Sequence, residues 1–376
     1  MSFFCRQHRP VLLATALLAL LAATAGATPP ATDNVNTPNP VLQHLEADYR
    51  EHVDKKRNLV YRWASDRDTF DRTRRVIEAW HDAHRAELFP GAFDRPVTIV
   101  LPTLADYRRL KLPENVGGLY HGASRTLISI SISSILGHEF THALHHHDQL
   151  AAGQEHALWA IEGLAMLYQF ASVKDGRFDI HLGPMLETVQ TDQKNDTLPP
   201  LATLLTLERK GFMADATRHY AAARYLTLYL YRKGKLADFY AAYKDGFDDD
   251  PTGRAALEKT LNADLKTIET DWAEWIAAIE PPWRSKRRIA AWLGVRMEDA
   301  EGGVRITGFV RGSPAGRAKV LKRGDVIVSI AGIPTPGPRE LTRAVQTFRP
   351  GQTVEVEVIR EDRTQTVRQT LGLIPR

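Results

Sequence analysis

Residues 137–148, GHEFTHALHHHD, contain five histidines and a glutamate, the side chains best suited to metal chemistry in this chain. His138 and His142 are four residues apart, so on a helix they lie on one face and can bind one ion together. Glu139 follows the first histidine and can act as a general base on water beside that ion. The pattern H-E-x-x-H therefore predicts a zinc site with a catalytic carboxylate. Three fixed positions are not very specific, so a surface helix with scattered histidines is the alternative.

A catalytic zinc usually has three protein ligands and one open position, so the pattern needs a third ligand elsewhere. Glu162 lies twenty residues after His142 in the apolar segment LWAIEGLAML, where an unpaired carboxylate would be costly. We therefore expect Glu162 to complete the site, and a salt bridge is the alternative. A second arrangement takes Asp148 as the third ligand, but it needs a glycine where His145 stands.

The elements that position these residues are predicted from hydrophobic periodicity. We expect helix from Leu42 to about Leu88, a short buried strand at Val97–Leu101, a half-buried strand of alternating isoleucine and serine at 128–133, and successive helices from Ala157 to about Glu280. The metal-binding segment directly follows the alternating strand and has an apolar flank, which favours a helix packed against the core. Two prolines and a basic run then end the helical region, and short strands with glycine turns follow.

The two motifs together resemble those of the gluzincin metallopeptidases. These enzymes combine an H-E-x-x-H helix with a downstream glutamate, often in the setting W-x-x-E-G-x-A, which is matched here by Trp159, Glu162, Gly163 and Ala165. The closest resemblance is to the compact bacterial peptidase MA-like domains, over roughly residues 94–278.

This resemblance implies both a fold and an activity. The fold expected is α+β: a mainly helical zincin-like metallopeptidase domain with a small mixed β-sheet. The activity expected is zinc-dependent hydrolysis of peptide bonds, with zinc on His138, His142 and Glu162, and with Glu139 as general base and acid. The exopeptidase motif G-x-M-x-N is missing upstream of the metal helix, which favours an endopeptidase.

The resemblance also implies residues for substrate binding and for the oxyanion. The strand over 117–131 would be the edge strand on which an extended peptide docks, with Gly118, Leu119 and Tyr120 in contact with it. A later tyrosine or histidine would stabilise the oxyanion. We expect Tyr220, 58 residues beyond Glu162, in that role. Its neighbour His219 is the rival, and an ordinary core tyrosine is the other alternative.

The C-terminal part, Leu293–Leu373, resembles PDZ domains of the type attached to bacterial periplasmic proteases. Residues 292–295, WLGV, match the carboxylate-binding loop, and 312–332 match the most specific stretch of the family. The resemblance implies a β-sandwich or partial barrel whose loop residues Leu293, Gly294 and Val295 bind a peptide C-terminus. A small β domain that only packs on the catalytic unit is the alternative.

The first 27 residues have the form of a secretory signal peptide, since two arginines precede a short apolar run that ends near AGA. An uncleaved anchor is the alternative, but the run is shorter than the ~20 residues of a membrane span. We expect export to a bacterial periplasm, with no stable membrane span after cleavage. The domains expected are a signal peptide at 1–27, a flexible lead at 28–41, the metallopeptidase domain at 42–281, a linker at 282–290 and the PDZ domain at 291–374.

The net charge indicates which classes of partner to expect, and the cysteine count indicates whether a disulfide can form. The formal net charge is +4, and it falls to 47 − 45 = +2 once residues 1–27, with two arginines and no acids, are removed. This is too small to indicate a nucleic-acid partner. Cys5 is the only cysteine, so no disulfide is expected. We expect protein or peptide substrates, and C-terminal peptide segments bound by the PDZ domain. The second hypothesis is a PDZ-containing envelope adaptor with a structural or vestigial zinc site.

Overall fold

The computed structural model describes residues 39, 41–91, 93–112, 117–130, 134–183, 185–280 and 291–374 of the 376-residue chain. The predicted signal peptide, nearly all of the flexible lead and the predicted linker lie outside these ranges. Within them, no helix has both the length and the apolar character that crossing a bilayer requires.

A five-stranded sheet forms the first part of the fold, in the order β1-β2-β3-β5-β4. The strands are β1 (Arg50–Asp54), β2 (Leu59–Trp63), β3 (Val97–Leu101), β4 (Gly118–His121) and β5 (Thr126–Ser129). The three inner strands are parallel, and the edge strands β1 and β4 pair antiparallel with their neighbours. Three helices, α1 (Arg67–Glu87), α2 (Leu104–Arg109) and α3 (Ser134–Ala152), and the 3-10 turn η2 (Leu42–His44) accompany the sheet. Helix α3 packs against β4 and β5.

Two predictions for this part are wrong in detail. The segment 42–88 was expected to be helical, but its first half forms the β1–β2 hairpin. Strand β2 alternates buried and half-buried residues because Leu59, Tyr61 and Trp63 face the core, and β-branched and aromatic residues favour a strand there. A half-buried strand was expected at 128–133, of which residues 131–133 lie outside the described ranges; the strand that the structure shows there, β5, spans Thr126–Ser129, and all four of its residues are buried. It lies between β3 and β4, with α3 packed against it.

Helices dominate the next part of the chain. They are α4 (Leu158–Gln169), α5 (Leu186–Lys194), α6 (Leu201–Leu204), α7 (Arg209–Ala214), α8 (Ala216–Arg232), α9 (Leu236–Asp245), α10 (Arg254–Leu261) and α11 (Leu265–Ala278). The predicted run of helices is interrupted by one hairpin, β6 (Ala171–Lys174) and β7 (Arg177–Ile180). One large core of buried apolar side chains joins these helices to α1, α3 and the sheet.

The C-terminal part is a separate β-rich unit with its own apolar core. Its main sheet has the order β14-β13-β11-β10-β9, and β12 pairs with β11. The elements are β8 (Ala291–Trp292), β9 (Val295–Ala300), β10 (Gly303–Phe309), α12 (Pro314–Ala318), β11 (Val326–Ile330), β12 (Ile333–Pro334), α13 (Pro338–Gln346), β13 (Thr353–Arg360), β14 (Arg363–Thr370) and β15 (Gly372–Leu373). Strands β8 and β15 form a separate pair.

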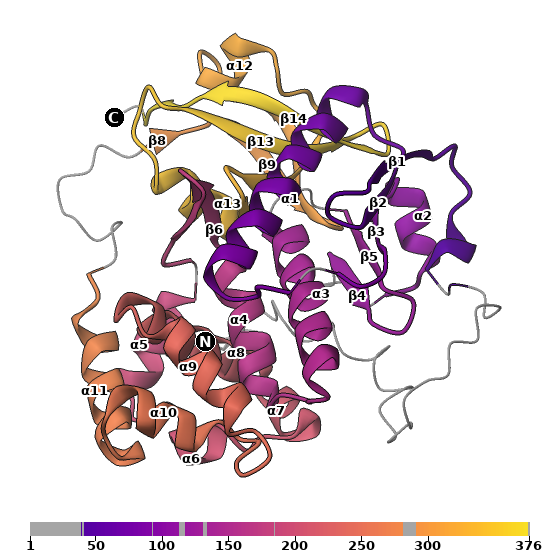
Figure 1. Cartoon of the computed structure of the whole chain (residues 1–376). Coiled ribbons are helices and arrows are strands. Elements are labelled where there is room, and N and C mark those ends of the chain that lie inside the picture. Colours follow the sequence, from indigo (N-terminus) through magenta and orange to yellow (C-terminus); the bar gives the residue numbers. More distant parts are fainter. Residues whose placement is uncertain are drawn as a thin grey trace, which may run out of the picture.

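The C-terminal unit packs directly on the first part of the fold, where its strands lie beside α1 and α2 (Figure 1). Leu104 of α2 shares an apolar cluster with Val326, Val328 and Ile359. The β13–β14 hairpin makes polar contacts as well. Its tip accepts hydrogen bonds from the first turn of α2, and Thr364 Oγ1 donates to the carbonyl of Ile130, just after β5, at 3.0 Å. The hairpin therefore contacts two segments that lead into β4 and α3.

Candidate metal centre

Helix α3 carries three of the predicted site residues and is held rigidly in the core. Leu136, Phe140 and Leu144 are buried on its apolar side. The ring of Trp80, from α1, packs so closely on the backbone of Gly137 that a methyl group there would lie 2.3 Å from it. Gly137 is therefore needed for this contact, which fixes the helix one residue before the first metal-binding candidate.

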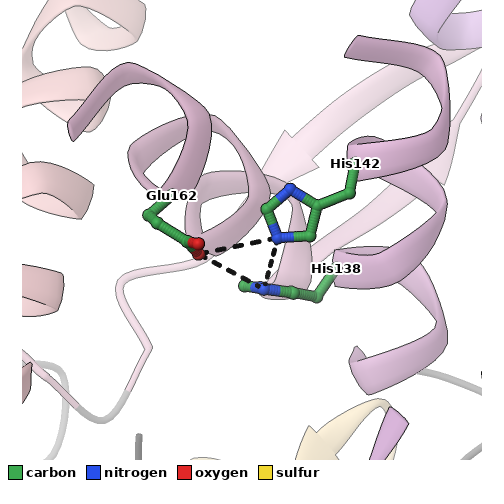
Figure 2. Close-up of side chains that lie close together, drawn as sticks. All are labelled: His138, His142 and Glu162. Carbon is green, nitrogen blue, oxygen red and sulfur yellow. Dashed lines mark hydrogen bonds and ion pairs between the residues drawn. The ribbon is translucent and has the colours of Figure 1, made fainter. Parts of the chain in front are cut away.

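The side chains of His138, His142 and Glu162 converge on one point (Figure 2). The two Nε2 atoms are 3.0 Å apart, and Glu162 Oε2 lies 3.7 Å from that of His138 and 3.5 Å from that of His142. With zinc–ligand bonds of 2.0–2.1 Å, a tetrahedral ion separates its ligand atoms by about 3.3 Å. The three observed separations bracket that value. The donor set thus fits one face of a zinc tetrahedron, which leaves a fourth position for water or substrate.

The ionisation states of His138 and Glu162 suit a cation, whereas His142 has to give up a proton to bind one. Burial, and then the neighbouring His142, lower the pKa of His138 to about 3, so that its ring is neutral and offers a lone pair. Burial would raise the pKa of Glu162, but His142 and His138 lower it overall, so the carboxylate is ionised. Burial lowers the pKa of His142, but Glu162 outweighs it and raises that pKa. Glu162 Oε2 has no hydrogen-bond partner among the described residues.

Glu139 lies between α3 and the edge strand β4. Its Oε2 accepts a hydrogen bond from the backbone N–H of Tyr120 at 2.8 Å, and its buried Oε1 has no partner among the described residues. Burial raises the pKa of Glu139 to about 7, a value suited to taking up and releasing a proton near neutral pH. A methyl group at Gly118 would lie 3.1 Å from Glu139 Cγ and 2.8 Å from Ile135. Glycine therefore allows β4 to approach the helix this closely.

The three predicted substrate-binding residues all lie on β4, but their side chains are not equally available. Leu119 is buried in a second apolar cluster, with Ile128 and Ile130, and Tyr120 is buried as well. Backbone groups of alternate strand residues point to the same side. The N–H of Tyr120 points away from β5 to Glu139, so the backbone groups of Gly118 point away from β5 too.

Tyr220 and His219 differ in how they are used. His219 Nδ1 lies 2.7 Å from the carbonyl oxygen of Phe212, which ties α8 to α7. Tyr220 is 2% exposed, and its buried hydroxyl lies near Glu162, so that a hydrogen bond to this carboxylate contributes to its raised pKa. Burial, and then the carboxylates of Glu162 and Glu139, raise the pKa of Tyr220 well above its ordinary value. Its hydroxyl is therefore a neutral donor within electrostatic range of both glutamates.

Gly163, next to Glu162, explains how α8 comes so near. A methyl group at this position would lie 2.9 Å from the carbonyl oxygen of Ala223 and 2.9 Å from Thr227 Cγ2. The hydroxyl of Thr227 donates to the carbonyl of Gly163 at 2.9 Å. Close packing of α4 on α8 thus brings Glu162 and Tyr220 to the same place, and it depends on a glycine in the sequence motif.

The alternative third ligand, Asp148, is engaged elsewhere. Helix α3 continues past it to Ala152, and Asp148 Oδ2 accepts from Tyr240 Oη at 2.6 Å and from Lys244 Nζ at 2.7 Å. His145 pairs with His156, since their Nε2 and Nδ1 atoms are 2.8 Å apart. Asp148 therefore links α3 to α9, and His145 links α3 to the loop before α4.

Two features of the site were not predicted from the sequence. One is the buried His145–His156 pair just described. The other is Arg209, whose Nη1 is buried without a partner among the described residues and whose charge lowers the pKa of Glu162, although less than the two histidines do. In the sequence, Arg209 stands between Glu208 and Lys210, both exposed, so local pattern gives no sign of it.

The loop predicted to bind a peptide C-terminus lies between β8 and β9. Leu293 is buried in the core of the C-terminal unit, and its carbonyl accepts from Ala315 N at 3.1 Å. Gly294 has φ +78°, and a methyl group there would lie 2.2 Å from Ser313 Cβ, so only glycine fits. Val295 begins β9, the edge strand that contacts α13.

Comparison with known proteins identifies the C-terminal unit. The PDZ domain family matches residues 291–371, so this part of the chain is a PDZ domain. The chain is also 41% identical over 64 residues to the DegP-like periplasmic serine endoprotease of Rhizobium meliloti (strain 1021). That match spans 17% of this chain and only 12% of the length of the relative.

Solved structures show limited similarity. The serine endoprotease from Yersinia pestis is 23% identical over 29% of this chain and 36% of its own, with a TM-score of 0.22. An aminopeptidase N family protein from Idiomarina loihiensis is 14% identical, over 87% of this chain and 67% of its own, with a TM-score of 0.35. These scores are too low to indicate a shared fold of the whole chains.

Proposed function

We propose that this protein is an exported zinc-dependent peptidase, acting as an endopeptidase, with a PDZ domain that binds C-terminal peptide segments. The convergence of His138 Nε2, His142 Nε2 and Glu162 Oε2, beside a buried glutamate with one free oxygen, is the observation that carries this proposal. Structural zinc sites are usually closed by four protein ligands, whereas catalytic sites keep one position open. Within the described residues, this cluster offers three ligands.

Zinc at this site would supply a Lewis acid that polarises a peptide carbonyl and makes water a better nucleophile at neutral pH. Glu139 Oε1 takes the proton from the attacking water, while the bond from Tyr120 N to its Oε2 holds the carboxylate in place. Glu139 then delivers the proton to the leaving amine. The neutral hydroxyl of Tyr220 donates a hydrogen bond to the carbonyl oxygen as negative charge develops on it.

The substrate would bind as an extended strand beside β4. Because Leu119 and Tyr120 are buried, recognition on this strand relies on outward-pointing backbone groups such as those of Gly118 instead of side chains. This mode tolerates many sequences and suits an endopeptidase that acts on unfolded chains. The loop Leu293–Val295 would hold a peptide C-terminus at the PDZ domain. The periplasmic location named for the DegP-like relative agrees with the expected signal peptide.

The same relative supplies a second candidate function, a serine endopeptidase. Its identity of 41% favours this, but it extends over 64 residues and 12% of the relative. Two inhibitors separate the candidates on a reduced, unfolded protein substrate. We expect a zinc chelator to abolish cleavage, re-added zinc to restore it, and a serine-directed phosphonofluoridate to leave it unchanged. The reverse pattern would favour the serine enzyme. One bound zinc per chain without cleavage, together with tight binding of C-terminal peptides, would favour an adaptor.

A further inference from the structure

Arg209 carries a buried nitrogen that the proposed reaction does not yet use. It is the first residue of α7, and its Nη1 has no hydrogen-bond partner among the described residues. Arg209 also forms no ion pair of 4.0 Å or less with any described residue. Arg218, in the following helix α8, does form ion pairs, with Asp192 and Asp215. A buried polar nitrogen without a partner is unfavourable and calls for an explanation.

The packing of α7 on α8 places Arg209 near the candidate metal centre. The rings of Phe212 and Tyr220 are in edge-to-face contact, with their centroids 5.1 Å apart. His219 Nδ1 forms a hydrogen bond with the carbonyl oxygen of Phe212. Arg209 precedes Phe212 by three residues, so the two share the helix face that meets α8. After burial and the nearer charged groups, the Arg209 guanidinium also lowers the pKa of Tyr220 and of Glu162. Arg209 is therefore within electrostatic range of the site.

A count of the charges at the zinc-loaded site leaves the positive charge of Arg209 without a negative partner. A zinc ion carries two positive charges, which the ionised forms of Glu139 and Glu162 balance, while the two histidines are neutral ligands. The guanidinium of Arg209 then adds one positive charge without a counter-ion in the described part of the chain. Arg209 is half-buried, but one nitrogen of its guanidinium is buried without a hydrogen-bond partner among the described residues, and a buried N–H group needs a partner. A single negative charge on the substrate would supply the partner.

We propose that Arg209 is a specificity residue that binds a carboxylate of the peptide substrate next to the scissile bond, an inference that rests on the proposed peptidase function. The planar guanidinium matches a carboxylate and can hold it through two hydrogen bonds. The carboxylate is either the free C-terminus of the substrate or the side chain of an aspartate or glutamate. The first would make the enzyme a carboxypeptidase instead of the endopeptidase proposed above, and the second would make it an endopeptidase directed to acidic sequences.

Calorimetric binding of matched peptides tests this without turnover. The protein is the full chain with Glu139→Gln, in its zinc-loaded and metal-free forms. One probe pair is acetyl-tetraalanine with a free or an amidated C-terminus, and the other is acetyl-Ala-Ala-Glu-Ala-Ala-amide or its glutamine counterpart. We expect one acidic peptide to bind about 10- to 100-fold more tightly than its neutral partner. Adding Arg209→Gln should remove the preference for the glutamate peptide and, for the free C-terminus, the part that the PDZ domain does not supply. Arg209→Lys should retain part of the preference.

Lys210→Gln is the matched control, because Lys210 is the next residue and is exposed; it should keep the full preference. Neither change touches the PDZ domain, so its preference for a free C-terminus is the same in all variants, and the contribution of Arg209 is the difference in preference between the variants. An unchanged preference in the Arg209→Gln protein, or none in the protein that retains Arg209, would overturn the inference. Either result can occur while chelator-sensitive cleavage persists. Conversely, a preference that depends on Arg209 in a protein without peptidase activity would contradict the proposed function alone.

Discussion

Replacing Asp362 with glycine should loosen the first turn of α2 without disturbing the hairpin that carries it. A helix begins with backbone N–H groups that have no partner inside the helix. In α2, the N–H of Leu104 donates to the carbonyl of Asp362 at 3.2 Å, and that of Ala105 donates to Asp362 Oδ2 at 3.1 Å. Thr103 Oγ1 accepts from Asp106 N at 3.1 Å. Two of these three groups are therefore satisfied by the PDZ domain.

The size of the effect follows from the single bond that is lost. Asp362 has φ +63°, a left-handed conformation that glycine adopts freely, so Asp362→Gly removes the side chain without straining the turn. The carbonyl that binds Leu104 remains. One hydrogen bond contributes about 1 kcal/mol to stability. Its loss in Asp362→Gly should therefore make the Ala105 amide open about fivefold more often.

Amide hydrogen exchange measures this residue by residue. We expect the Ala105 amide to exchange about fivefold faster in Asp362→Gly and the Leu104 amide to change much less. Glu361→Gly is the matched control, since Glu361 is exposed, has φ +49° in the same turn and makes no hydrogen bond to α2. Unchanged exchange at Ala105, or equal acceleration by both variants, would refute the view that the PDZ hairpin caps α2.

Three further predictions concern the centre and the core. Zinc at a thousandfold excess over its dissociation constant should raise the unfolding free energy of the full chain by about 4 kcal/mol, and it should not stabilise the His142→Ala variant. Equal stabilisation of the two proteins in calorimetry would contradict the assignment of His142 as a zinc ligand. Gly163→Ala should lower the unfolding free energy in urea by about 1–2 kcal/mol, because crowding against Ala223 outweighs the gain in helix propensity; a gain in stability would show that α4 and α8 separate freely. Burial lowers the pKa of His84 to about 3, so below pH 6.5 the unfolded chain binds a proton that the folded chain excludes. His84 should therefore lower the unfolding free energy by about 2 kcal/mol on going from pH 6.5 to pH 5, and this contribution should be absent in His84→Gln. The same dependence of unfolding free energy on pH in both proteins would show that His84 is protonated in the folded chain.

Much of the centre is accessible to sequence reasoning because it depends on local spacing. The positions of His138 and His142 on one helix turn bring their nitrogens together in any α-helix. Glu162 stands out because a carboxylate in an apolar helix needs a partner. The glycine after it also carries information, since it allows α8 to approach.

Other features depend on tertiary contacts that no local pattern encodes. The position of Arg209 depends on the packing of a six-residue helix against α8. Asp362 binds an amide 257 positions away. The β1–β2 hairpin was mistaken for helix because its charged residues blur the period of two in a short strand. A strand was expected at 128–133 and β5 covers Thr126–Ser129; the burial of β5 depends on its neighbours on both sides.

The most direct test of the central proposal compares the full chain with its Glu139→Gln variant on one unfolded protein substrate, with zinc content measured in both. Glu139 is not among the three ligands, so the proposal predicts one zinc per chain in each protein and cleavage by the unaltered chain alone. Equal cleavage by the two proteins, or cleavage without bound zinc, would contradict it.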